Sequence, residues 1–252
     1  MDANQFQKDI LLNLERWNKK PLLRTIYRDF HRVIAARLSG LENPYVVELG
    51  SGIGNIKEII PDCMRTDLFP NPWIDQTENA YALSFADGTL SDLILFDVFH
   101  HLRHPGTALR EFERVLRPGG RVLIFDPFIS LMGALVFGAL HTEPIGWRDY
   151  IDWYAPKGWS AQDSDYYAAQ GNATRIFFGR LDKSLLKNWT VVSRQRFAAI
   201  SYVASGGYSG PQLYPERAYG LMQGIDQVLN HLPPLFATRT LVVLEKKKSE
   251  PE

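Results

Sequence analysis

Residues 47–54 read VELGSGIG, and this stretch decides the fold. The apolar run at residues 45–49 predicts a short buried strand, and glycines follow it at the alternate positions 50, 52 and 54. Because glycine has no Cβ, such a loop can turn tightly and let a ligand approach the backbone. A helix is expected next, through residues 56–60. Open parallel sheets bind ligands beyond the carboxyl ends of their strands, so the loop predicts a binding site there.

Strands and helices alternate along the chain, which predicts a parallel α/β sheet with right-handed crossovers. The N-terminal residues 5–38 have apolar side chains at helical spacing, with a break near residues 18–21. The other predicted elements are strands at 64–67, near 74–78, at 93–97 and 121–125, a turn at 117–120, helices at 107–116 and about 215–230, a strand at 190–193 or 196–202, and a final strand at 238–245.

The amino-acid composition argues against several classes of protein. The 252 residues carry 28 basic and 28 acidic side chains, and this zero net charge disfavours non-specific nucleic-acid binding. The single cysteine, Cys63, excludes an internal disulfide and a zinc site built from cysteines. The longest nearly apolar run, residues 128–140, is too short to span a bilayer, and no signal peptide is recognised. We therefore expect a cytoplasmic protein without a transmembrane segment, with at most a weak peripheral membrane contact, and its oligomeric state stays open.

The glycine spacing differs from that of dinucleotide-binding proteins. Gly50 and Gly52 fit the first two glycines of G-x-G-x-x-G, but Asn55 stands where the third is required. An acid instead precedes the first glycine by two residues, which gives E-x-G-x-G-x-G over residues 48–54. A hydride-transferring enzyme with a nicotinamide cofactor is therefore disfavoured.

With this loop and the motifs that follow it, the sequence resembles the class I S-adenosylmethionine-dependent methyltransferases. E-x-G-x-G-x-G resembles motif I of that family, and Asp67 stands where its second strand ends in an acid. Residues 96–102 (FDVFHHL) and 116–123 (LRPGGRVL) resemble its motifs around the fourth and fifth strands. The resemblance covers residues 45–126, and the broad type 11 small-molecule methyltransferases are the most similar subgroup.

One further segment resembles the family with two departures. Residues 79–88 (NAYALSFADG) resemble the D-A-x-x-L-P-F-x-D-G segment that lines the adenine, but Asn79 replaces the usual Asp and Ser84 the usual Pro. Asn79 can accept through its carbonyl or donate through its amide, so a contact with adenine is still expected there.

The resemblance implies a Rossmann-like, doubly wound, mostly parallel seven-stranded sheet that binds S-adenosylmethionine. It implies methyl transfer by direct displacement, because the sulfonium charge activates the methyl group and the protein mainly binds, aligns and dehydrates the reactants. The residues that it places at the cofactor come from motif I, the ends of the second and fourth strands and the adenine segment. They are Glu48, Gly50, Ser51, Gly52, Gly54, Asp67, Leu68, Asn79, Ala80, Asp97 and Val98.

The chain is predicted to be a single methyltransferase domain, residues 1–252. Its parts are an N-terminal helical cap (1–40), a cofactor-binding half (41–126), an insertion (127–184) and the C-terminal half of the sheet (185–248). The insertion is rich in aromatic residues, among them Trp153, Trp159 and Tyr167, and follows the fifth strand on the acceptor side. We expect a lid over a small or amphiphilic organic acceptor. Alternatively, these aromatic residues form the core of the insertion itself.

His101, His100 and Glu143 are the candidate catalytic residues, with His141 a further choice. A histidine suits proton removal at neutral pH, because its reference pKa is about 6.5. If the turn after the fourth strand is helical, neighbouring side chains diverge by about 100°, and we expect His101 to face the pocket. No metal is expected, although Asp97 and the histidine pair resemble the ligands of some metal-assisted relatives. A non-catalytic, cofactor-binding regulatory module is the alternative function.

Overall fold

Among the described residues, seven strands form one mixed sheet, which confirms the Rossmann-like α/β prediction. The computed structural model describes residues 3–139, 144–147, 149–163, 167–179 and 183–248. The strands are β1 (Val46–Leu49), β2 (Met64–Asp67), β3 (Gln76–Thr77), β4 (Leu90–Phe96), β5 (Leu116–Pro127), β6 (Trp189–Phe197) and β7 (Arg239–Lys246). Their order is β3-β2-β1-β4-β5-β7-β6, and β7 runs antiparallel to both neighbours while the other pairs are parallel.

The strand order reverses between β1 and β4, in the middle of the sheet. The chain runs from β1 outward to β2 and β3, then returns to β4 on the other side of β1. Leu49, the last residue of β1, pairs with Leu95 near the end of β4. The carboxyl ends of these two strands therefore lie together while their loops diverge, which is where open α/β sheets bind ligands.

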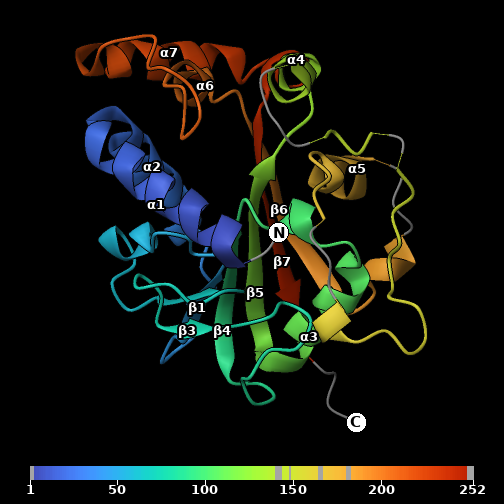
Figure 1. Ribbon diagram of the computed structural model, residues 1–252. Helices are drawn as coiled ribbons and strands as arrows, with labels where there is room; N and C mark the ends of the chain where they lie inside the picture. The colour runs from blue at the N-terminus through green and yellow to red at the C-terminus, as the bar shows by residue number, and fades with distance from the viewer. Residues whose placement is uncertain (1–2, 140–143, 148, 164–166, 180–182, 249–252) are drawn as a thin grey trace.

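Helices cover both faces of the sheet (Figure 1). The helices are α1 (Ala3–Lys19), α2 (Pro21–Ala35), α3 (Pro105–Val115), α4 (Leu131–Ala139), α5 (Asn172–Phe178), α6 (Ile200–Ala204), α7 (Tyr219–Leu229) and α8 (Pro233–Phe236), with 3-10 turns η1 (Asn55–Glu58), η2 (Phe99–His101), η3 (Ala161–Asp163), η4 (Lys183–Leu186) and η5 (Glu216–Ala218). Leu23 and Ile34 of α2 pack on one face of the sheet. Phe112 of α3 and Phe177 of α5 pack on the other.

The N-terminal helices agree with the predicted pattern. The break falls at Lys20, and Pro21 occupies the first turn of α2, where its missing N–H leaves no hydrogen bond unmade. Leu23, Tyr27 and Ile34 are buried at helical spacing. Tyr27 stacks on Phe96 at the end of β4, with ring centroids 5.2 Å apart. The connections between β1, β2 and β3 are too short to form helices that cover this face of the sheet, and α2 covers it instead.

Those crossovers are shorter than predicted. The helix expected through residues 56–60 is instead the four-residue 3-10 turn η1, because Gly54 enters it in a left-handed conformation and Pro61 follows. Strand β3 has two residues rather than the five at 74–78. Residues 117–120, predicted as a turn, belong to β5, which begins at Leu116 with an irregular register against β4.

The C-terminal elements match the prediction in kind. Strand β6 covers the first of its two predicted positions and reaches into the second. The helix predicted at about 215–230 consists of η5 followed directly by α7, and the final strand is β7. Within the insertion lie α4, the 3-10 turn η3 and α5.

His31 of α2 makes stability depend on pH. Its side chain is 2% exposed and packs edge-on against Tyr27 and Phe96, and burial lowers its pKa from 6.5 to about 4. Between these values the unfolded chain binds a proton that the folded chain does not, so stability falls as the pH drops. Between pH 7 and pH 4 the free energy of unfolding should fall more in the wild type than in His31→Leu. The difference between the two losses should reach about 3 kcal/mol. Equal losses in urea unfolding would contradict a buried neutral imidazole.

Candidate active site

A cavity of about 860 Å³ lies at the switch point between β1 and β4. Its walls come from α1, from the loops after β1, β2 and β4, from residues 78–81 and from the insertion. Eight of the residues predicted at the cofactor line it: Gly50, Gly52, Asp67, Leu68, Asn79, Ala80, Asp97 and Val98. The other three, Glu48, Ser51 and Gly54, lie behind this lining.

The glycine loop approaches the turn after β4 closely. Gly50 has a φ of +72°, and a Cβ built on it would lie 2.3 Å from Cγ2 of Val98. Gly52 has a φ of +53°, and a Cβ there would have only Ile10 of α1 within 4 Å, at 3.7 Å, so its open side faces the cavity. A Cβ on Gly54 would instead meet the carbonyl of Trp73 at 2.4 Å, so Gly54 serves packing.

Asp67 ends β2 at the cavity and holds the glycine loop. Its Oδ2 accepts a hydrogen bond from the Gly52 N–H at 2.9 Å, and its Oδ1 accepts one from the Leu68 N–H at 2.7 Å. Burial raises the pKa of Asp67, and the backbone donors oppose that rise. Each carboxylate oxygen has two lone pairs, so Asp67 can still accept from a ligand hydroxyl.

Glu48 lies buried beneath the loop, and its Oε2 has no hydrogen-bond partner among the described residues. Burial raises its pKa to about 7, against the opposing hydrogen bond from Ser51. Ser51 bridges β1 and β2, since its hydroxyl donates to the Glu48 carbonyl at 3.2 Å and accepts from the Thr66 N–H at 3.2 Å. Glu48 thus places a carboxyl group with spare acceptor capacity behind the cavity wall.

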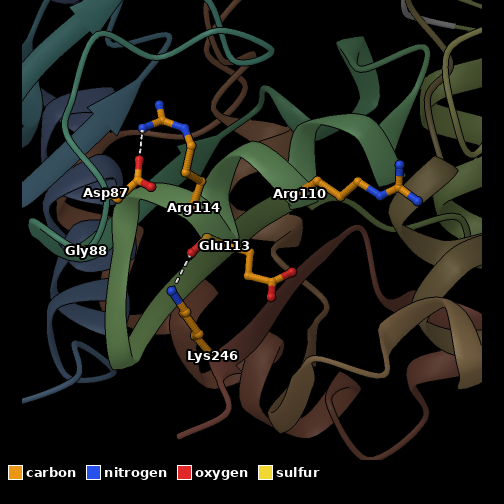
Figure 2. A pocket seen from close by; sticks show the side chains of 6 residues that line it. All are labelled: Asp87, Gly88, Arg110, Glu113, Arg114 and Lys246. Carbon is orange, nitrogen blue, oxygen red and sulfur yellow. Dashed lines mark hydrogen bonds and ion pairs between the residues drawn. The ribbon is translucent and has the colours of Figure 1, made fainter. Parts of the chain in front are cut away.

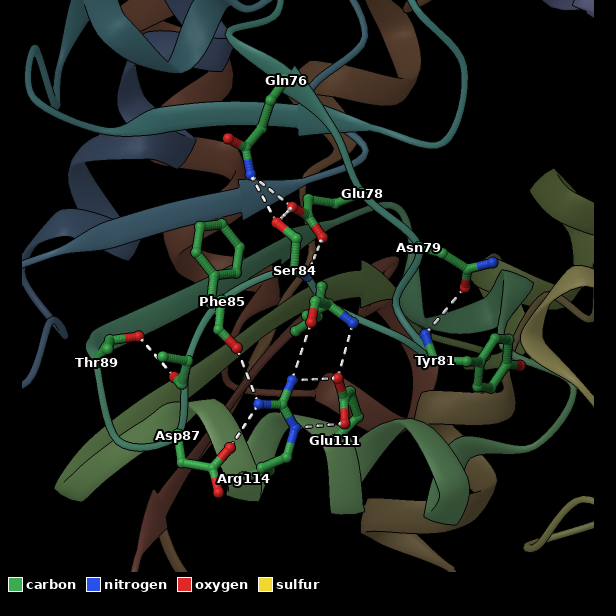
Figure 3. Close-up of polar contacts among 12 residues, drawn as sticks. Gln76, Glu78, Asn79, Tyr81, Ser84, Phe85, Asp87, Thr89, Glu111 and Arg114 are labelled. Carbon is green, nitrogen blue, oxygen red and sulfur yellow. Dashed lines mark hydrogen bonds and ion pairs between the residues drawn. The ribbon is translucent and has the colours of Figure 1, made fainter.

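The two departures from the family segment both have structural reasons. Asn79 donates from Nδ2 to the Ala161 carbonyl at 3.0 Å, which ties residues 79–88 to the insertion. Its Oδ1 accepts from the Tyr81 N–H (Figure 3). An aspartate could not donate this bond. The Ser84 N–H donates to Glu78 at 2.9 Å, a bond that proline cannot make.

The same segment is clamped to α3. The Arg114 guanidinium donates to Glu111, to Asp87 and to the carbonyls of Leu83 and Phe85, as Figure 3 shows. These bonds fix residues 83–87, so the cavity wall at residues 78–81 rests on a rigid base.

Asp97 reaches the cavity but its carboxyl group is engaged. The residue has a φ of +55° where β4 ends, and its carboxylate forms an ion pair with the buried Arg239 of β7. The pair lets Arg239 stay charged, since its pKa is raised by Asp97 in spite of burial. The Asp97 side chain is still 29% exposed, so a ligand would meet a carboxylate whose charge is offset by Arg239.

The histidine pair divides between the cavity and the core. His101 lines the cavity, and its Nδ1 lies 2.8 Å from the Tyr167 carbonyl of the insertion. His100 is 2% exposed, and its Nδ1 lies 2.9 Å from Oδ1 of Asp126. The two rings are in contact, with centroids 4.1 Å apart. His141 and Glu143 lie outside the described residues.

Sequence reasoning missed several residues of the cavity. Phe6, Ile10 and Asn13 of α1 line it, although the sequence shows only an amphipathic helix far from the motifs. His104 also lines it, and its Nδ1 lies 3.1 Å from the Asp152 carbonyl. Arg103 lies at the cavity above the Tyr167 ring, 5.4 Å from its centroid. Of these residues, only His104 could have been suspected from the sequence, because it lies three residues after the histidine pair.

A second hollow, of about 500 Å³, carries no comparable arrangement (Figure 2). Its charged groups bond to the protein itself: Lys246 donates to the carbonyls of Glu113 and Leu116, Arg114 pairs with Asp87, and Arg110 lies over the Tyr154 ring. Within the described ranges, no three metal-ligating side chains cluster, and no helix has the length and apolar character needed to cross a membrane.

Comparisons with known proteins support the methyltransferase prediction. Residues 48–124 match the family described as "Methyltransferase domain". A chain from the complex of the Haloferax volcanii Trm112 methyltransferase activator with the putative methyltransferase has a TM-score of 0.55 and 14% identity, covering 100% of each chain. A SAM-dependent methyltransferase from Archaeoglobus fulgidus has a TM-score of 0.53 and 15% identity, covering 89% of this chain and 94% of its own. No curated protein matches the sequence significantly.

Residues 48–124 are therefore a methyltransferase domain, the chain has the fold of solved SAM-dependent methyltransferases, and S-adenosylmethionine is the cofactor that this domain indicates. The cavity suits this molecule chemically. Gly52 leaves open the space that a side chain would fill, and Asp67 offers acceptors to hydroxyl groups. The spare oxygen of Glu48 adds negative potential behind a cationic ligand.

Asp67 should carry a large share of cofactor affinity. Asp67→Ala removes the acceptor for ligand hydroxyls and also releases the Gly52 N–H, so we expect a loss of about 2–4 kcal/mol in S-adenosylmethionine binding. Asp67→Asn keeps one acceptor oxygen and should lose less. Calorimetry with S-adenosylmethionine and S-adenosylhomocysteine measures both affinities. The control is Asp62→Asn, at an exposed turn before β2. Unchanged affinity in a folded Asp67→Ala protein would contradict this role.

Proposed function

We propose that the chain methylates a small organic acceptor bound between η2 and the insertion, with His101 as the general base. The observation that carries this proposal is the hydrogen bond from His101 to the Tyr167 carbonyl. A carbonyl only accepts, so Nδ1 carries the proton in the neutral ring and the basic lone pair is on Nε2. The bond therefore fixes the tautomer that can remove a proton from an acceptor.

The lining of the cavity favours a small, partly aromatic acceptor. Tyr154, Trp159 and Tyr167 of the insertion line it together with Tyr81, which is the composition of a small-molecule site. Trp159 packs edge-on against both Tyr81 and His104, with centroids 5.0 Å and 5.3 Å apart. A flat acceptor could pack against this group of rings.

In this proposal the cofactor supplies an electrophilic methyl group, and the residues of the chain align and deprotonate the acceptor. His101 takes the proton of an oxygen or ammonium nucleophile. His104 is fixed by the Asp152 carbonyl in the same tautomer, so its Nε2 accepts a hydrogen bond from the acceptor and orients it. The insertion excludes water from the reacting atoms.

His100 and Asp126 are proposed to position His101. Asp126 is fully buried, and burial raises its pKa while His100 opposes the rise. Because the His100 ring bonds to Asp126 and lies against the His101 ring, it restricts the orientation of His101. His100 does not line the cavity, so it acts through its neighbour.

His101→Ala should lower single-turnover methyl transfer by about 10²–10⁴-fold, the usual span for a lost general base, with cofactor affinity nearly unchanged. His100→Ala should lower stability and, because it removes a contact that orients His101, should also reduce methyl transfer, by less than His101→Ala does. Rates measured from pH 5 to 9 should lose their acidic limb in His101→Ala, and His231→Ala, on an exposed turn, is the matched control. Equal small losses in both cavity-region variants would leave the pair a packing role, and sensitivity to a chelator would favour a metal-assisted reaction.

Trp159→Ala tests the insertion as the acceptor site. Removing a ring that contacts both Tyr81 and His104 should raise the KM for an aromatic acceptor by about tenfold, corresponding to about 1.5 kcal/mol, while cofactor affinity stays within twofold. Trp147→Ala, a 57% exposed tryptophan of the same insertion, is the control. Deletion of the segment is a poorer test, because Trp153 is buried against Gly106 in the core. An unchanged KM would place the acceptor elsewhere.

A further inference from the structure

Helix α7 is amphipathic, but its polar side chains face the protein and its apolar side chains do not. Tyr219 and Gln223 donate to the carboxylate of Asp29 on α2, at 2.7 Å and 2.9 Å. Asp226 accepts from the Ile200 N–H at 2.6 Å and from Ser201, at the start of α6. These three side chains recur at helical spacing, so the opposite face of α7 is left to the solvent.

That outer face is apolar. Leu221, Ile225 and Val228 recur at spacings of four and three and are 70%, 39% and 68% exposed. The stripe continues beyond the helix in Leu232 and Leu235, which are 53% and 42% exposed. A soluble surface helix normally has the reverse arrangement, so packing within the chain does not explain the stripe.

Helix α4 extends the same surface. Leu131 and Leu135 are 71% and 61% exposed, and the Ser130 hydroxyl donates to the Leu235 carbonyl, which joins α4 to α8. Figure 1 shows α4 and α7 across the same end of the molecule. Helices α4, α7 and α8 together contain one charged residue, the inward-facing Asp226, although 22% of the chain is charged. We call this surface the apolar platform.

The border of the platform carries groups that suit a lipid headgroup region. Arg194 and Arg196 of β6 are exposed and form no ion pair within the described ranges, and Arg196 lies over the Phe128 ring that precedes α4. Trp147 and Tyr150 are 57% and 86% exposed and follow α4 in the chain. Tryptophan and tyrosine favour membrane interfaces, because one end of each ring is apolar and the other polar.

We propose that the apolar platform docks on an anionic lipid bilayer. Charge complementarity favours this occupant: an uncharged apolar surface meets hydrocarbon, and the bordering arginines meet negative headgroups. The docking does not depend on the acceptor, and it would hold even if methyl transfer used another base.

The platform lies at the catalytic end of the sheet. Strand β5 runs toward α4 (Figure 1). Its carboxyl end lies on the same side of the sheet as those of β1 and β4, and residues at these two strand ends line the cavity. Docking through α4 and α7 would therefore bring the mouth of the cavity near the bilayer surface, where an amphiphilic acceptor would concentrate.

Vesicle co-sedimentation of the full-length protein tests the proposal. Vesicles of phosphatidylcholine with 30–40% phosphatidylglycerol, a composition on the order of cellular anionic content, should bind the wild type. The triple variant Leu131→Ser, Leu135→Ser, Val228→Ser should bind at least about tenfold more weakly, because each apolar side chain that is replaced no longer contributes its free energy of transfer into lipid. Arg194→Glu with Arg196→Glu should weaken binding to the anionic vesicles and leave binding to pure phosphatidylcholine unchanged.

The control is Val191→Ser with Val192→Ser, which alters exposed apolar side chains of β6 (39% and 45% exposed) away from the platform. It should bind vesicles like the wild type. The apolar variants change exposed side chains, so each should keep its melting temperature and its affinity for S-adenosylhomocysteine. Arg194 also donates to the Phe177 carbonyl at 2.8 Å, so the arginine variant is compared at temperatures below its own unfolding. Absence of wild-type binding, or equal binding by the platform variant, would overturn the proposal. So would a wild-type dimer in sedimentation velocity that the platform variant dissociates, because the surface would then join two copies.

Discussion

The backbone conformation of the glycine loop is the constraint on which the site depends. Gly50, Gly52 and Gly54 all have positive φ, and the loop passes so close to Val98 that Gly50 has no room for a Cβ. This approach brings the end of β1 against the turn after β4, and the Gly52 N–H against Asp67 at the end of β2. Three strand ends therefore meet at one cavity, and a side chain at Gly50 would separate them.

The carboxylates around the cavity are stabilised in different ways, and this difference sets their roles. Asp97 is neutralised by Arg239, and Asp126 is bonded to His100. Asp67 rests on backbone N–H groups, which leaves lone pairs for a ligand. At Glu48 burial outweighs the opposing hydrogen bond from Ser51 and raises the pKa to about 7. A cationic ligand would favour its ionised form, so binding should release a proton near neutral pH.

Local sequence patterns predicted the sheet, the glycine loop and the position of Asp67, because each of these depends on a few neighbouring residues. Contacts between distant segments were not predictable. Nothing in the sequence places Phe6 beside the loop, and the packing of α1 alone decides it. The same holds for the bond from Asn79 to Ala161, where the sequence showed a departure from a family motif but not its partner. The role of His101 stays a prediction, although the structure gives the orientation of its ring.

Helix α1 has a practical consequence for handling the protein. Its first turns carry Phe6 and Ile10, which line the cavity, and Phe6 contacts Phe69 after β2 with ring centroids 5.2 Å apart. Residues added before α1 would begin close to this cavity wall, so we expect an N-terminal affinity tag to alter the measured cofactor affinity. The last strand, β7, ends at Lys246 near the second hollow, at the other end of the sheet. A C-terminal tag is therefore the neutral choice for ligand-binding work.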